Sequence, residues 1–161
     1  MNRLFQWLQF PLRRIAEISL AAMMLLTVVD VLGRYVFHFP VAGSVELTEM
    51  LMVAVIFAGI PLATAAHAHV AVDLVTMTLG PRARRVQQAA SHLLALCASL
   101  LFGVVSWDRA LSAHEFQDQT TILSLPLAPM VFFMSTLLFV NALGNMAQLW
   151  AVLTDKEPLH A

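Results

Sequence analysis

Four long apolar runs, separated by short polar stretches, make up most of the 161-residue chain. A transmembrane helix needs about 20 mainly apolar residues to cross roughly 30 Å of hydrocarbon. The charge-free region between Asp118 and Asp155 is too long for one straight helix and too short for two, and prolines 126 and 129 favour a helix start there. The predicted spans are residues 15–37, 47–66, 86–107 and 126–150. The sequence therefore predicts an all-α integral membrane protein with four transmembrane helices in a single membrane domain, residues 1–161.

The overall composition agrees with a membrane environment. The chain is 60% hydrophobic and 12% charged, with a mean hydropathy of +0.78, whereas soluble domains are about half apolar and a quarter charged. The net charge of −1 gives no reason to expect a nucleic-acid partner. The single cysteine, Cys97, lies in an apolar run, which excludes a disulfide framework and a thiolate metal site.

The first apolar run also resembles a signal peptide, because basic residues precede it. No convincing small-residue cleavage site follows soon after its apolar core, and the run continues through Asp30 to Tyr35, which is too long and too polar for a cleaved signal. We expect a retained signal anchor that forms the first span.

The distribution of lysine and arginine predicts the orientation of the four spans. Positive residues concentrate in cytoplasmic loops. Seven fall on one side of a four-span topology and two, Arg34 and Arg109, fall on the other. This split predicts N-in/C-in topology in a bacterial inner membrane. The seven are Arg3, Arg13, Arg14, Arg82, Arg84, Arg85 and Lys156.

Two short segments are too short or too polar to span and are predicted to lie at the membrane surface. Residues 1–14 mix aromatic and basic side chains, which favour the headgroup layer, although a frayed terminus is the alternative. Residues 70–79 are apolar, and Asp73 can cap a short helix there, ahead of an arginine cluster. The expected interfacial anchors are Trp7, Arg13, Arg14, Arg82, Arg84 and Arg85.

Asp30 and Arg34 are the deepest charges in the first span. An acid four residues before a base is a favourable helical spacing, so the two side chains can form a pair. A carboxylate within a membrane is by default a candidate functional group. The simpler interpretation is a pair at the outer edge, with Arg34 reaching the interface.

Glu46 and Glu49 follow Ser44, a good N-cap for the second span. Acids in a first helical turn complement the positive end of the helix dipole, which is a sufficient explanation for both. The alternative is that one of them meets a basic group on a partner subunit.

Histidines provide weak evidence for a metal or haem site. His67, His69 and Asp73 have a spacing seen in metal sites, but no further ligand is near in sequence, and capping is the simpler role. Haem between spans needs paired axial ligands, and only His92 lies clearly within a span. We therefore expect no metal and no cofactor.

Asn141 and Asn145 lie one turn apart in the fourth span. Amide side chains on a transmembrane helix favour hydrogen bonds to neighbouring helices, so both are expected to have packing roles. No Gly-rich phosphate loop, Ser/His/Asp order or catalytic carboxylate pair occurs in the chain. The sequence therefore predicts a protein that is not an enzyme.

Several short motifs occur in a familiar order between Asp30 and Asp73. Arg34-Tyr35-Val36-Phe37 ends the first span, and Gly43-Ser44-Val45-Glu46-Leu47 opens the second. Phe57-Ala58-Gly59 and His69-Val70-Ala71-Val72-Asp73 follow. In these motifs, in length and in the number of spans, the chain resembles the small membrane subunit (the Q, or DctQ-like, component) of tripartite ATP-independent periplasmic (TRAP) transporters. Asparagine is frequent in that family near the position of Asp30.

The resemblance implies a small, non-catalytic membrane subunit of a sodium-coupled importer of organic acids. Its partners would be a large multi-span permease subunit, which holds the sodium and substrate sites, and a periplasmic substrate-binding protein. Asp30, Arg34, Glu46, Glu49, His69, Asp73, Asn141 and Asn145 are the candidate structural or subunit-interface residues. A stand-alone proton-coupled exporter, with Asp30 or Glu17 as its coupling group, is the alternative, and a membrane anchor for a redox enzyme is a third.

Overall fold

The computed structural model describes residues 3–65 and 81–154, without the side chains of residues 3–8, 65, 81, 82 and 84. Within this part of the chain, four helices account for nearly all the structure: α1 (Arg3–Tyr35), α2 (Ser44–Ala65), α4 (Pro81–Glu115) and α5 (Ala128–Thr154). All four are long and apolar enough to cross a membrane. The predicted fold class, all-α with four transmembrane helices, is confirmed.

The helix α1 is longer than its predicted span because it includes the segment expected to precede that span. It runs from Arg3 to Tyr35 without a break and passes through Pro11. Arg13 and Arg14 both bond to Glu17, at helical spacings that support continuity just after the proline. Residues 3–14 are therefore the first turns of α1, not a separate element.

The other helix limits also differ from the apolar runs. α4 continues past residue 107 to Glu115 and includes Asp108 and Arg109, because polar residues need not end a helix that has left the hydrocarbon. The Ser112 hydroxyl bonds to the carbonyl of Asp108 within this extension. α2 begins at the predicted cap, Ser44, and α5 begins at residue 128, with a proline in its first turn.

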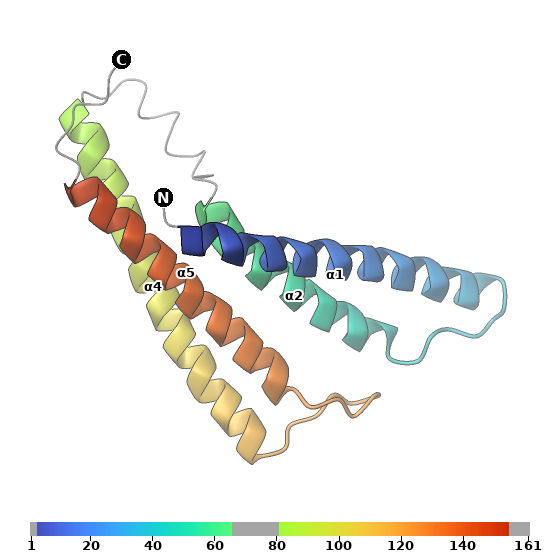
Figure 1. The fold of residues 1–161 in the computed structure, drawn as a ribbon. Helices are drawn as coiled ribbons and strands as arrows, with labels where there is room; N and C mark the ends of the chain where they lie inside the picture. Colours follow the sequence, from blue (N-terminus) through green and yellow to red (C-terminus); the bar gives the residue numbers. More distant parts are fainter. Residues whose placement is uncertain (1–2, 66–80, 155–161) are drawn as a thin grey trace.

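The helices form an open row in the order α1, α2, α5, α4, as Figure 1 shows. Two antiparallel hairpins, α1–α2 and α4–α5, meet where α2 packs on α5, while α1 and α4 lie at opposite edges with little or no mutual contact. A small apolar core joins three of the helices through Leu12, Ala58 and Leu137. This arrangement is a layer of helices and not a closed bundle.

The two hairpins diverge toward the end that carries the α1–α2 and α4–α5 connections, here called the outer end. The start of α1, the end of α2, the start of α4 and the end of α5 lie at the opposite end (Figure 1). An apolar cleft of about 400 Å³ lies between α1 and α2 and extends to Met130 at the start of α5. The chain thus alternates in direction as a four-span topology requires, and the N-in/C-in orientation stays a prediction from the arginine distribution.

Large apolar side chains cover the outside of the row. Ile18, Leu94 and Trp150 are each about two-thirds exposed or more, and all four helices contribute further examples. So large an apolar surface marks contact with lipid or with a partner protein.

Candidate functional site

The most deeply buried polar group of the described chain is centred on Asn141 of α5. The Thr64 hydroxyl of α2 donates to Asn141 Oδ1 over 2.7 Å, and Asn141 Nδ2 donates to Ser99 Oγ of α4, also over 2.7 Å. All three side chains are buried. One amide on α5 therefore contacts both neighbouring helices at the same level.

Asn145, one turn further along α5, extends this network. Its Nδ2 donates to the carbonyl of Asn141 over 3.0 Å, so its Oδ1 is left as the acceptor that lies 3.3 Å from His92 Nδ1 of α4. His92 Nδ1 must then carry the proton, because an acceptor oxygen requires a donor opposite it. Asn145 is fully buried, so bulk solvent cannot replace these bonds.

Two further bonds join α5 to its neighbours. Ser135 Oγ donates to the carbonyl of Gly103 in α4 over 2.8 Å, and Gln148 Nε2 donates to the carbonyl of Thr64 in α2, also over 2.8 Å. Glycine at position 103 allows the close approach, since a Cβ there would press on Phe139. We call the whole set the buried polar network: Thr64, His92, Ser99, Ser135, Asn141, Asn145 and Gln148.

The physical effect of this network is to fix how α5 lies against α2 and α4. Lipid tails are as apolar as the side chains they replace, so burial alone gives little preference for one helix register over another. Hydrogen bonds across helices are directional, and measured examples in a membrane protein average about 0.6 kcal/mol, with about 1–2 kcal/mol in model peptides. Five such contacts therefore specify one arrangement of three helices.

At the outer end, Asp30 closes the α1–α2 connection. One carboxylate oxygen accepts from Arg34 over 3.0 Å, and the other accepts from the backbone N–H of Val41 over 3.0 Å. The connection also folds back on Gly33, whose carbonyl accepts from the N–H of Phe39. Asp30 is only 14% exposed while Arg34 is 57% exposed, so the aspartate faces the loop and the arginine faces outward.

Glu46 joins the two hairpins. Its carboxylate accepts from the backbone N–H groups of Ile122 (2.7 Å) and Leu123 (2.9 Å), at the tip of the α4–α5 connection, residues 116–127. Successive N–H groups that converge on one anion form a small backbone nest. Leu123 also packs on Gly43, where a positive φ of 75° and the nearby leucine both require glycine.

The connection 116–127 has the internal structure needed to present this tip. Thr120 and Leu125 are paired by a backbone bond and by the threonine hydroxyl, and Gln119 bridges Pro126. The turn includes Ser124 with a φ of 52°. The connection is therefore a short folded hairpin that reaches across the divergence between α5 and α2 (Figure 1).

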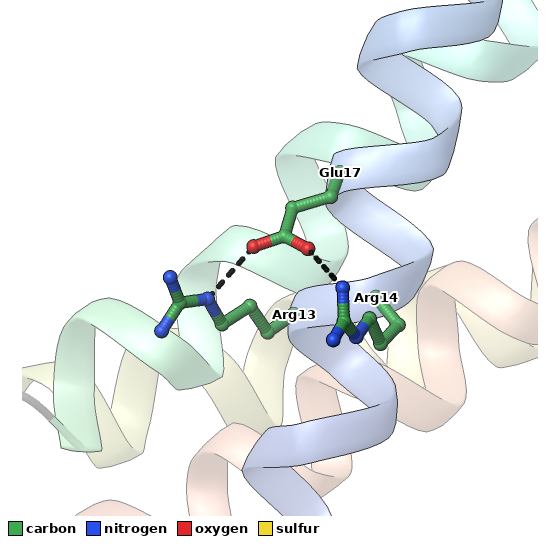
Figure 2. A network of polar contacts seen from close by, with 3 residues as sticks. All are labelled: Arg13, Arg14 and Glu17. Carbon is green, nitrogen blue, oxygen red and sulfur yellow. Dashed lines mark hydrogen bonds and ion pairs between the residues drawn. The ribbon is translucent and has the colours of Figure 1, made fainter.

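Figure 2 shows a third polar group, at the opposite end of α1. Arg13 Nε donates to one oxygen of Glu17 over 2.8 Å, and an NH of Arg14 donates to the other over 3.2 Å. The Arg14 guanidinium also stacks over the ring of Phe10, 5.2 Å from its centre. All these side chains are largely exposed on the surface of the helix.

The structure thus separates the residues singled out in the sequence. Asn141 and Asn145 come together in the buried network, and Asp30 and Arg34 form their pair. The Glu46 carboxylate accepts hydrogen bonds from backbone amides of the same chain. This role differs from the two considered for it, which were compensation of the helix dipole and contact with a basic group on a partner subunit. Glu49 lies exposed on α2, and its carboxylate contacts no donor in the described chain.

Other predicted residues lie outside the described part. His69, Asp73 and the proposed surface segment 70–79 fall in the range that is not described, and so do the side chains of Trp7, Arg82 and Arg84. Arg13, Arg14 and Arg85 are exposed. Among the described residues, no three His, Cys, Asp or Glu side chains gather in a way that would hold a metal ion.

The partners of Asn141 and Asn145 were not identified from sequence. One signal was present: in α4, His92, Ser99 and Gly103 are spaced by seven and four residues, which places them on one helical face. Uncharged polar residues at that spacing in an apolar run mark a helix–helix contact. No comparable signal linked Glu46 to a loop 76 residues away.

These helices can be compared with known families. The family described as tripartite ATP-independent periplasmic transporters, DctQ component, matches residues 23–154. The chain belongs to the DctQ family. The match covers the last part of α1, residues 23–35, and all of α2, α4 and α5, so it includes the buried polar network and both outer contacts. No match was found among curated proteins.

Membership of the DctQ family makes this chain a small membrane subunit of a tripartite transporter, with multiple membrane passes. The resemblance drawn from the motifs between Asp30 and Asp73 is confirmed. A DctQ protein is one component of a three-part transport system.

Proposed function

We propose that this DctQ chain braces the large permease subunit of a sodium-coupled, binding-protein-dependent importer of organic acids in a bacterial inner membrane. The substrate class is carboxylates. In this proposal the chain is non-catalytic and binds neither sodium nor substrate, which bind to the large subunit.

The buried polar network is the observation that supports bracing. A subunit that carries substrate across a bilayer must move against something that does not move. Hydrogen bonds from Asn141, Asn145, Ser135 and Gln148 fix α2, α5 and α4 in one register, while large apolar side chains remain on the outside of the row. A rigid layer with apolar outer faces is suited to hold a larger membrane protein at constant depth.

The positions of the charges favour bracing over proton-coupled export. A coupling carboxylate should lie near the middle of a span and face a cavity. Of the two candidates named for export, Asp30 lies toward the end of α1, and both Asp30 and Glu17 bond to arginines of the same helix. Their charges are therefore already paired on their own helix.

Reconstitution tests the proposal. Proteoliposomes that contain the large subunit and the binding protein, with or without this chain, would be given an inward sodium gradient and a labelled carboxylate. We expect sodium-dependent uptake only with all three components. Full uptake without this chain would remove the bracing role.

The two rival functions need separate measurements. The purified chain alone, reconstituted in vesicles with a pH gradient, is expected to move no proton-coupled cargo. Its visible absorption spectrum is expected to show no haem band. Activity in the first experiment would establish the exporter, and a haem band in the second would establish a redox anchor.

A further inference from the structure

The group formed by Arg13, Arg14 and Glu17 has more positive charge than its own contacts neutralise. Two guanidinium groups share a single carboxylate, which leaves a net charge of one at this place on α1. A guanidinium has five N–H donors, and Glu17 accepts from one nitrogen of each arginine. Figure 2 shows the remaining nitrogens of both side chains directed away from the carboxylate.

These side chains face away from the protein. Leu12, Ile15 and Ala16 of the same turns pack in the apolar core, so residues 13, 14 and 17 occupy the opposite face of α1. The side chains of Arg13, Arg14 and Glu17 are 75%, 60% and 45% exposed. In a membrane, this face of an edge helix is available to lipid.

The depth of the group matches a headgroup layer. Arg14 and Arg34 are twenty residues apart in one unbroken helix, which corresponds to about 30 Å at 1.5 Å per residue, the thickness of the hydrocarbon. With Arg34 at the outer boundary, Arg13 and Arg14 lie at the other boundary. The exposed ring of Phe10 beneath the Arg14 guanidinium also suits this layer.

We propose that Arg13 and Arg14 together bind the phosphate of an anionic phospholipid in the leaflet at the start of α1. Glu17 is a positioning residue: by accepting from both arginines it holds their guanidiniums on one side of the helix. Planar guanidiniums bind phosphate oxygens through paired hydrogen bonds. The phosphate neutralises the remaining positive charge at a boundary where water screens it less than in bulk.

Lipid binding by the intact chain tests this proposal. The purified protein in detergent would be titrated with phosphatidylglycerol and with phosphatidylcholine, and bound lipid would be counted by native mass spectrometry. We expect the double variant Arg13→Gln with Arg14→Gln to bind phosphatidylglycerol about tenfold to thirtyfold more weakly. Arg109→Gln, an exposed arginine at the outer end, is the matched control and should bind like the wild type.

Two further measurements distinguish a specific phosphate site from non-specific electrostatic attraction. The double variant Arg13→Lys with Arg14→Lys keeps both charges and loses the planar geometry, so it should bind several-fold more weakly than the wild type. Equal binding by the lysine variant would overturn the proposal, since charge alone would then suffice. Inorganic phosphate should not displace the lipid at matched concentration, and displacement would show a site for soluble phosphate instead.

Discussion

The contact of α5 with its neighbours and the contact of α1 with α2 are built on different physical principles. α5 is joined to α2 and α4 by hydrogen bonds from buried amides and hydroxyls. α1 packs on α2 through apolar side chains such as Ile15 and Ala58. The hydrogen bonds described between α1 and the loop that leads to α2 lie at the outer end, from Val41 to Asp30 and from Phe39 to Gly33. Within the described residues, hydrogen bonds fix α2, α5 and α4, whereas the body of α1 packs on its neighbours through apolar side chains.

This difference indicates which part of the molecule is the rigid one. Apolar packing between helices in lipid permits small shifts in register, because a displaced side chain meets acyl chains of similar polarity. A displaced asparagine loses a hydrogen bond that lipid cannot replace. We therefore expect α2, α5 and α4 to act as one unit, with α1 as an edge helix that adjusts to its surroundings.

Asn141→Leu should have the largest effect on the free energy of unfolding. A negligible effect would contradict the difference drawn between α5 and α1. Leucine has a similar size but cannot bond to Thr64 or Ser99, so both hydroxyls lose a partner. We expect a loss of about 1–3 kcal/mol in the free energy of unfolding. Unfolding by SDS in mixed micelles can be followed through Trp107 fluorescence, because that ring packs edge-on against Phe132 and Phe139 between α4 and α5.

A matched substitution on the lipid side of the same helix provides the control. Met146→Leu changes an exposed side chain of α5 and should leave the unfolding free energy within the measurement error. If both variants unfold alike, the buried polar network contributes nothing specific, and α5 would be no more rigidly held than α1.

Glu46→Ala should have the next largest effect, confined to the outer end. Without the carboxylate, the N–H groups of Ile122 and Leu123 lose their acceptor. We expect these two amides to exchange with deuterium about fivefold to tenfold faster, equivalent to about 1 kcal/mol of lost protection. Hydrogen exchange with fragment analysis of residues 116–127 measures this directly.

Glu49→Ala is the control for the Glu46 contact. It removes an equal charge three residues further along α2, at an exposed carboxylate with no donor in the described chain. Exchange at residues 122 and 123 should not change. Equal acceleration in both variants would mean that net charge, and not the hydrogen bonds, protects the connection.

Ser135→Ala tests the same comparison with a smaller expected effect on the free energy of unfolding. The Ser135 hydroxyl bonds across to Gly103, whereas the hydroxyl of Thr136, the next residue, bonds within its own helix to Phe132 and is exposed. We expect a loss of about 0.6 kcal/mol for Ser135→Ala and a smaller one for Thr136→Val. The reverse order in the same SDS unfolding assay would show that bonds between helices are not the stabilising ones.

The sequence predicted most of the fold because membrane crossing restricts helix length and polarity directly. It did not predict that α4 continues to Glu115, because the apolar run ends at the membrane boundary whereas the helix continues beyond it. Asn141 and Asn145 were identified as polar residues for helix contacts, since an amide in hydrocarbon needs a partner. Their partners depend on the register between helices that are far apart in sequence. The pattern of residues along the sequence does not reveal this register.

The charged pair at the outer end of α1 should give the smallest effect. Asn at position 30 keeps an oxygen that can accept from Val41, so Asp30→Asn retains the loop contact and loses only the charge pair with Arg34. Because Arg34 is 57% exposed, that pair contributes about 0–1 kcal/mol. Asp30→Ala loses the loop contact as well and should be the more destabilised variant.

We expect Asp30→Asn to assemble normally and to reduce sodium-driven uptake several-fold at most, with the double variant Asp30→Asn and Arg34→Gln no worse than either single change. Uptake in proteoliposomes across a range of pH, with expression checked for each variant, measures this. Complete loss of uptake in a normally assembled Asp30→Asn transporter would show that the charge itself takes part in transport, and the α1 edge would then be more than a structural element.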